Sequence, residues 1–372
     1  MSRRRQPAAA GARQATRTDR LSYRGDPSDN KHMEQRFLGS SGLSVSSLSL
    51  GTMTFGGKGR HAAMGALDAE RAGHLVDIAI EQGVTLFDTA DIYSEGLAEE
   101  VLGATLKGRR QSVQIATKAF SPMGPGPNDF GLSRHHLISA CEASLRRLAT
   151  DYIDLYQAHS MDSITPMEET LGAFDTLVRQ GKVRYIGCSN FSAWHTMKAV
   201  AISDDSGLAR YVSQQIQYSL LVRDAEYELI PMGLDQGVGV MAWSPLMFGL
   251  LSGKIRRDAP QPTEGRLAAL GAPIKVDWER LYRIVDVMLE IAAGRGVTPA
   301  QVALNWVRSK PGVDTVILGA RNEEQLRDNL ASAAWELNAD EMARLDAVSA
   351  GAEPYPNWHQ QTWAGARNPH LP

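Results

Sequence analysis

The sequence predicts an α/β protein built as a single (β/α)8 TIM barrel, and three observations support this fold. Short apolar runs alternate with amphipathic stretches at a spacing of about 30 to 40 residues, which is typical of βα units that share a parallel sheet. Eight such runs are present, the number that closes a barrel of this type. Three of the runs end in polar residues, at the strand ends where such barrels carry their chemistry.

The first predicted element is a short hairpin ahead of the barrel. The segment FLGSSGLSVSSL, residues 37–48, contains a glycine in its turn, and we expect it to plug the bottom of the barrel. Residues 1–33 are rich in Arg, Ala and small polar residues, and we expect a disordered extension there, with the barrel domain at 34–372. The extension could be a dispensable tail, the product of a start codon placed upstream of Met33, or an organelle transit peptide.

The predicted strands are apolar runs of five or six residues, and the predicted helices fill the intervals between them. The strands cover 47–51, 84–88, 112–117, 152–156, 182–187, 212–216, 238–243 and 314–318. The helices cover 68–82, 97–107, 134–148, 167–180, 192–202, 224–236, 298–309 and 322–332. Ser133 and Thr298-Pro299 stand just before two of these helices, where a hydroxyl can cap free backbone N–H groups and proline fits the first turn.

Two further segments are predicted near the barrel mouth. The connection after the seventh strand, residues 244–297, is too long for an ordinary βα connection and is a candidate lid over a ligand. Its second half repeats apolar residues at helical spacing between Leu281 and Ile291. The tail from residue 353 is aromatic and proline-rich, and we expect it to fold back over the barrel mouth as a wall of the substrate site.

Composition narrows the class of function and the compartment. The net charge is −3 with acidic and basic residues interspersed, so we expect no nucleic-acid partner. We also expect no membrane partner, because no apolar run reaches the roughly 20 residues that a transmembrane helix needs. The two cysteines, Cys141 and Cys188, form no CxxC motif and no disulfide framework, which fits a cytoplasmic protein. We expect a monomer or homo-oligomer whose partner is a small molecule.

Four polar residues at the ends of three successive predicted strands suggest carbonyl reduction. They are Asp88 and Tyr93 in LFDTADIYSEG, Lys118 in VQIATKAF and His159 in IDLYQAHSMD. A carbonyl that accepts hydride needs a proton for its oxygen, and Tyr93 could supply it. Lys118, held by Asp88, would place positive charge beside the phenol and lower its pKa, while His159 would orient the carbonyl oxygen.

Less specific interpretations exist for each residue. A buried Asp–Lys pair is often structural, a tyrosine after a strand is often packing, and a single histidine is more often a core residue than a catalyst. A metal-dependent barrel hydrolase that uses Asp88 and His159 is a further alternative. The chain has no GxGxxG after an early strand and no GxxxxGK[ST], so neither a Rossmann nucleotide site nor a phosphate-binding P-loop is expected.

The motifs that contain these residues resemble the aldo-keto reductase superfamily over about residues 35–348. The family block that carries the Asp and Tyr is similar to GVTLFDTADIYSEG in this chain. The block that ends in the His is similar to GLSRHHLISACEASLRRLATDYIDLYQAHSMD. The block with the nicotinamide-binding Ser-Asn is similar to GKVRYIGCSNFS. The resemblance implies an NADPH-dependent reductase, of bacterial type, in which Asp88, Tyr93, Lys118 and His159 act together. The loop WSPLMFGLLSGK is similar to that of the potassium-channel β-subunits, which leaves open a regulatory subunit that binds NADPH with little turnover.

The resemblance also implies a cofactor site that crosses the barrel mouth. It places Ser189, Asn190 and Gln215 on the nicotinamide carboxamide and Trp243 against the ring. It assigns the remaining cofactor contacts to Gly51, Thr52, Met53, Asp88, Ser244, Pro245, Leu246, Gly249, Ser252, Lys254, Arg266, Gly319, Arg321, Gln325, Asp328 and Asn329. Arg321 and Arg266 are the basic candidates for the adenosine 2′-phosphate, and two charge-assisted bonds would favour NADPH over NADH by at least about tenfold.

The substrate is expected to be an apolar carbonyl compound. Besides Tyr93 and His159, the candidate linings are Phe55, Phe120, Trp194, Met247, Tyr355, Trp358 and Trp363. An aromatic mouth suits a bulky cyclic or aromatic ketone, such as a secondary metabolite or xenobiotic, better than a free sugar. Cys188, which adjoins Ser189 and Asn190, is given no role.

Overall fold

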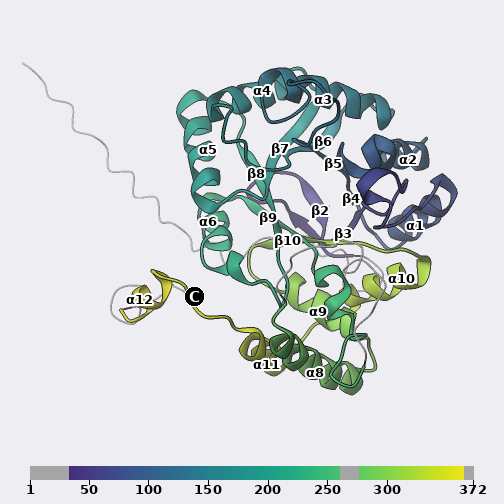
Figure 1. Ribbon diagram of the computed structural model, residues 1–372, viewed down its shortest axis with the longest axis vertical. Coiled ribbons are helices and arrows are strands. Elements are labelled where there is room, and N and C mark those ends of the chain that lie inside the picture. Colours follow the sequence, from purple (N-terminus) through teal and green to yellow (C-terminus); the bar gives the residue numbers. More distant parts are fainter. Residues whose placement is uncertain (1–32, 260–275, 364–372) are drawn as a thin grey trace, which may run out of the picture.

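The computed structural model describes residues 33–259 and 276–363, and these form a closed parallel barrel surrounded by helices (Figure 1). The barrel strands follow the order β10-β3-β4-β5-β6-β7-β8-β9. They are β3 (Leu48–Gly51), β4 (Leu86–Asp88), β5 (Gln114–Ala119), β6 (Ile153–Ala158), β7 (Val183–Ser189), β8 (Tyr211–Gln217), β9 (Gly239–Trp243) and β10 (Val313–Leu318). Each predicted strand overlaps one of these, so the prediction of a (β/α)8 barrel is confirmed.

The described helices lie outside the strands, and all but α12 form a ring around them (Figure 1). They are α1 (Ala69–Glu81), α2 (Leu97–Thr105), α3 (Arg134–Arg147), α4 (Met167–Arg179), α5 (Ala193–Ser206), α6 (Leu229–Gln236), α8 (Trp278–Arg295), α9 (Pro299–Arg308), α10 (Glu323–Ala331), α11 (Ala339–Ser349) and α12 (Asn357–Gln361). The Ser133 and Thr298 hydroxyls cap α3 and α9 as predicted. No described helix has the length and apolar character needed to cross a bilayer.

The predicted N-terminal hairpin is confirmed and closes the bottom of the barrel. Strand β1 (Gln35–Phe37) pairs antiparallel with β2 (Ser44–Ser46). Leu38 and Val45 from the hairpin join an apolar cluster inside the barrel with Leu86, Ala116, Leu155, Met241 and Ile317. The turn needs Gly39, because its φ is +60° and a Cβ there would lie 2.4 Å from two backbone oxygens. Met33, the first described residue, is also buried.

Two helical predictions differ from the structure for identifiable reasons. The predicted helix 224–236 is divided into a 3-10 turn at Asp224–Glu226 and α6. Pro231 has no backbone N–H and is tolerated only in the first turn of a helix, so α6 begins shortly before it. Helix α11 was not predicted, although Asn338 and Glu341 form a capping box that marks its start.

The long connection after β9 is confirmed, but the predicted position of the tail is wrong. The connection contains the 3-10 segment η5 (Met247–Ser252) and helix α8, and Arg266 lies outside the described residues. The tail runs along the loop after β8, where Asn357 donates to the Tyr227 carbonyl at 3.3 Å, and Figure 1 shows α12 outside the ring of helices. Its aromatic rings contact one another and remain exposed, so they do not anchor the tail across the mouth.

Candidate active site

The carboxyl ends of the parallel strands bring the predicted residues to one end of the barrel. Asp88 is the last residue of β4, Lys118 lies one residue before the end of β5, and His159 follows β6 directly. Strand β4 pairs with β5, and β5 pairs with β6, so these residues lie close together, because neighbouring parallel strands end side by side.

Tyr93 begins a 3-10 turn, η2 (Tyr93–Gly96), that follows β4. The next two residues, Ser94 and Glu95, have φ angles of 50° and 56°, a conformation that residues other than glycine rarely adopt. Ser94 donates to the Phe55 carbonyl at 2.7 Å and accepts from Gly57 at 3.0 Å, which holds this strained turn in place. Backbone strain of this kind is concentrated at functional sites.

Lys118 is fully buried and bridges Asp88 and Tyr93. Its ammonium donates to Asp88 Oδ2 at 2.7 Å and to the Thr89 carbonyl at 2.7 Å. It also lies 5.1 Å from the centre of the Tyr93 ring, where its charge acts on the phenol. Burial lowers the pKa of Lys118, but Asp88 and Tyr93 together raise it by more, so the ammonium stays charged.

The pKa of Tyr93 departs from the sequence prediction. Burial raises the pKa of the phenol, Lys118 acts in the opposite direction, and Asp88 adds to the increase, so that the pKa lies above its ordinary value. The expectation that Lys118 makes this phenol unusually acidic is therefore wrong, because desolvation outweighs the ammonium. The hydroxyl is protonated at neutral pH.

Tyr93 lies between two histidine rings. The His159 ring packs edge-on at 5.9 Å between centroids, and the His61 ring packs on Tyr93 at 5.5 Å. Sequence reasoning missed His61, which is buried at the end of a 3-10 turn, η1 (Gly59–His61), between β3 and α1. No predicted element contained it, and only its position in a loop that follows a strand could have drawn attention to it.

A chain of hydrogen bonds joins this group to the predicted nicotinamide contacts. Gln215 Nε2 donates to Asp88 Oδ1 at 2.8 Å, and the Ser189 hydroxyl donates to the Gln215 carbonyl at 3.0 Å. Asn190 donates to the Ser189 hydroxyl at 3.0 Å and to the His159 carbonyl at 3.1 Å, and it accepts from the Trp243 indole at 3.1 Å. The structure therefore connects all four of these residues to the Asp88–Lys118–Tyr93 group.

Other predicted cofactor residues lie around the same end of the barrel. Thr52 follows β3, and its hydroxyl is buried without a hydrogen-bond partner among the described residues. In the loop after β9, Ser244, Met247 and Phe248 all have positive φ. Further members of the set are partly buried or exposed, namely Gly51, Met53, Leu246, Gly249, Ser252, Lys254 and Gly319, whereas Pro245 is buried.

The four predicted cofactor residues near α10 differ in how exposed they are and in what they contact. The side chains of Arg321 and Gln325 are exposed at its start, and Gln325 accepts from the Arg321 backbone N–H at 3.1 Å. Asn329 is buried. The Asp328 carboxylate instead accepts hydrogen bonds from Thr298 and Gln301 at the start of α9, which gives it a structural role.

The predicted substrate-lining residues are only partly brought together. Phe120 packs on Phe130 at 4.9 Å in the loop after β5, and Trp194 stacks on His195 at 3.5 Å at the start of α5. Met247 is buried and its sulfur accepts from Gln217. Two predictions are corrected here. Phe55 is fully buried under the Tyr93 turn, and Trp358 lies on the exposed tail with Tyr355 and Trp363.

Both cysteines are buried, and their thiols are unreactive. Cys188 precedes Ser189, its sulfur lies 3.7 Å from the Thr196 hydroxyl, and burial raises its pKa to about 12. Burial also raises the pKa of Cys141 to about 12. The thiolate is the reactive form, so neither residue is suited to nucleophilic chemistry.

Residues 47–350 match the family model of the Aldo/keto reductase family, and the chain belongs to that family. It is 39% identical over 330 residues to the uncharacterized oxidoreductase YrpG of Bacillus subtilis, covering 86% of this chain and 97% of that protein. It is 37% identical over 308 residues to a probable voltage-gated potassium channel subunit beta of Arabidopsis thaliana, covering 80% and 90%. A putative channel subunit beta of Schizosaccharomyces pombe is 36% identical over 335 residues, covering 86% and 94%. The protein is therefore an oxidoreductase.

Proposed function

We propose that the protein reduces an aldehyde or ketone to the alcohol, reversibly, with hydride from NADPH and the proton from Tyr93. The observation that carries this proposal is the position of the buried Lys118 ammonium, which is paired with Asp88 and lies against the Tyr93 ring. A tyrosine held in this way can donate a proton to a developing alkoxide and leave a phenolate that the ammonium stabilises.

The raised pKa of Tyr93 suits the reductive direction. Burial keeps the phenol protonated, so the proton donor is ready when the carbonyl oxygen gains charge. Lys118 contributes after the proton has moved, because its charge favours the phenolate over the phenol. His159, packed against the Tyr93 ring, is placed to donate a hydrogen bond to the same oxygen and fix its direction.

The nicotinamide cofactor supplies the hydride, and the residues at the barrel mouth fit it. Ser189, Asn190 and Gln215 offer hydroxyl and amide groups that match a carboxamide, and the buried Thr52 hydroxyl has no other partner among the described residues. The Trp243 ring is tied to Asn190, so it has a fixed position next to these groups. Arg321 at the start of α10 supports a preference for NADPH, because a guanidinium binds a phosphate group well.

The substrate class that we favour is a bulky cyclic or aromatic ketone, such as a secondary metabolite or xenobiotic. Support comes from Phe130 in the loop after β5, Ile164 in the loop after β6 and Trp194 at the start of α5, which have 47%, 90% and 60% of their surface exposed. Apolar side chains exposed beside a reactive group gain free energy when an apolar substrate covers them.

The two other functions considered from the sequence are less well supported. A regulatory subunit would accord with the names of the Arabidopsis and fission yeast relatives, but in this chain the four residues proposed for reduction lie together. A hydrolytic metal centre at Asp88 is disfavoured, because Lys118 and Gln215 occupy both of its oxygens. Among the described residues no group of three His, Cys, Asp or Glu could hold a metal ion.

The direct test is NADPH oxidation in the presence of a panel of simple aldehydes, quinones and cyclic ketones. We expect steady turnover with at least one apolar member of the panel. Saturable NADPH binding without turnover on any compound would contradict the reductase proposal and favour the regulatory function.

A further inference from the structure

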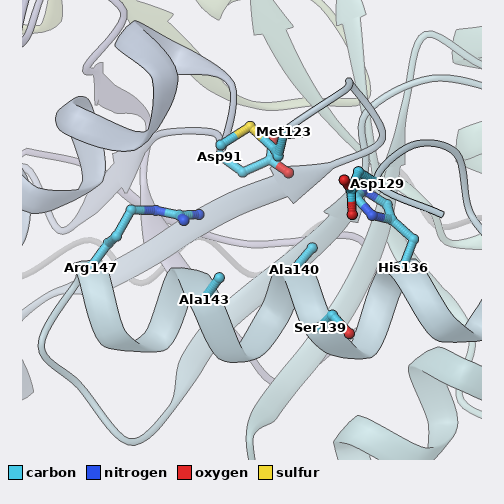
Figure 2. Close-up of a pocket in the computed structure, with 8 residues that line it drawn as sticks. All are labelled: Asp91, Met123, Asp129, His136, Ser139, Ala140, Ala143 and Arg147. Carbon is cyan, nitrogen blue, oxygen red and sulfur yellow. The ribbon is translucent and has the colours of Figure 1, made fainter. Parts of the chain in front are cut away.

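A cavity of about 200 Å³ lies on the outer side of the barrel, between α3 and the loop that follows β5. Figure 2 shows the side chains that surround it, which come from the turn after β4, the β5–α3 loop and one face of α3. The lining residues are Asp91, Met123, Asp129, His136, Ser139, Ala140, Ala143 and Arg147. None of the four proposed reductase residues is among them.

Asp91 is the most unusual group in this cavity. Asp91 is fully buried, and neither of its carboxyl oxygens has a hydrogen-bond partner among the described residues. Its backbone N–H donates to the Lys118 carbonyl at 3.1 Å, which fixes the residue in the turn that leads to Tyr93. Burial, and then the nearby Glu99, raise its pKa well above the ordinary value. A buried carboxyl without partners is unfavourable unless something in the cavity binds it.

The rest of the cavity leaves room for a ligand. His136 is buried, and its Nε2 also has no partner among the described residues. The floor is formed by Ser139, Ala140 and Ala143 of α3, whose small side chains do not fill the space below Asp91 (Figure 2). For comparison, an apolar cavity of about 150 Å³ accommodates a benzene molecule.

The charges around the cavity favour a cation over an anion. The acidic groups are Asp91, Asp129 and Glu99, and the cations that act on Asp91 are Arg147 and Lys118, of which Lys118 is paired with Asp88. Arg147 is already committed, because it donates to Glu99 at 2.7 Å and to the Ser144 hydroxyl at 3.2 Å. A metal ion is not favoured, because the described acidic and imidazole groups do not converge as three ligands.

We propose that this cavity binds a small organic cation that carries N–H groups, such as an alkylammonium or guanidinium compound, with Asp91 as its anchor. The positive charge and N–H donors satisfy the Asp91 carboxyl, and the carbon atoms contact Met123 and the alanines of α3. The site is separate from the proposed reductase site, and either assignment can fail without the other.

The test is a titration of the full-length protein, labelled with ¹³C at methionine methyl groups, with ethylammonium chloride followed by NMR. Met123 lines the cavity, and its signal is assigned by comparison with Met123→Leu. We expect a saturable shift of the Met123 signal. Asp91→Asn removes a charge-assisted hydrogen bond, so it should lower the affinity for ethylammonium at least about tenfold. Ala143→Leu, which retains the Asp91 charge and narrows the cavity, should also lower the affinity for ethylammonium.

Asp151→Asn is the matched control, because it removes the same charge from an exposed residue just beyond α3. It should bind ethylammonium like the unaltered protein. The proposal is overturned if ethylammonium gives no saturable shift, since the cavity then holds only water. It is also overturned if sodium acetate binds as tightly as ethylammonium, or if both cavity variants bind like the control.

Discussion

Gln215 donates a hydrogen bond of 2.8 Å to Asp88 across the barrel, although the two residues are 127 positions apart in the sequence. Strands β4 and β8, which carry them, lie on opposite sides of the closed barrel. Lys118 takes the other carboxylate oxygen, so Asp88 links the pair beside Tyr93, the proposed proton donor, to the predicted nicotinamide contacts. Such preorganisation lets charge develop at a site without rearrangement of its surroundings.

Replacement of Tyr93 by phenylalanine should abolish most of the turnover and leave cofactor binding intact. The ring remains, but the hydroxyl that donates the proton is lost, so kcat should fall by about 10² to 10⁴. Steady-state NADPH oxidation measures the loss, and quenching of tryptophan fluorescence measures binding. Tyr156→Phe is the control, because it removes a buried hydroxyl that donates to the Leu137 carbonyl. Full turnover in the Tyr93 variant would contradict the mechanism.

Replacement of Lys118 by methionine should shift the pH dependence of alcohol oxidation to higher pH. That direction needs the Tyr93 phenolate, so its rate rises with pH through the pKa of Tyr93, and Lys118 lowers that pKa. Without the ammonium the pKa rises further, and the inflection in the rate profile should move upward. Lys182→Met, which breaks the surface pair with Glu142, is the charge-matched control. An unchanged inflection would exclude the role assigned to Lys118.

The same Lys118 variant should be less stable. Asp88 is left as a buried carboxylate with only Gln215 as a side-chain partner, and removal of one member of a buried ion pair costs about 3 to 5 kcal/mol of unfolding free energy. Urea unfolding followed by circular dichroism measures this loss. A loss as small as that of Lys182→Met would show that the pair carries little of the stability.

Replacement of Arg321 by alanine should weaken NADPH much more than NADH. A guanidinium on the 2′-phosphate contributes about 1.5 to 3 kcal/mol, so the KM for NADPH should rise at least about tenfold. The KM for NADH should hardly change. Arg327→Ala is the control, because Arg327 is exposed on the same helix and pairs with Glu323. Equal effects on both cofactors would count against the assignment of Arg321.

Two glycine substitutions should act in opposite directions on stability. Gly39→Ala forces a side chain into a left-handed turn and against two backbone oxygens, so it should lower the unfolding free energy by about 2 kcal/mol or more. Gly172→Ala lies within α4, where a Cβ meets no atom within 4 Å, and it should raise stability by up to about 1 kcal/mol. Thermal unfolding distinguishes the two results, and equal behaviour would contradict the hairpin argument.

The barrel was predictable because every strand and most helices carry a local pattern in the sequence. Strand ends also located Asp88, Lys118 and His159, since parallel strands bring their ends together. The position of the tail was not predictable, because its aromatic residues have no periodic spacing that would indicate a contact surface. The Tyr93 pKa could not be read from the sequence either, because its direction depends on how far burial outweighs the Lys118 ammonium.

The contact of His61 with Tyr93 was also not predictable from the sequence. A loop of irregular structure brings it against Tyr93, and such contacts depend on backbone turns that leave no repeating pattern in the sequence. Asp91 was equally hidden, because the space beside it arises from small residues on α3, more than 40 positions away.

The depth of Cys188 would have a practical consequence if the protein reduces carbonyl compounds as we propose. Unsaturated carbonyl compounds and quinones alkylate accessible thiolates, and a nucleophilic sulfur next to Ser189 would make each encounter a risk of permanent damage. Here that sulfur is enclosed and remains a neutral thiol. Burial of the Cys188 thiol therefore disfavours alkylation at this position by a reactive substrate.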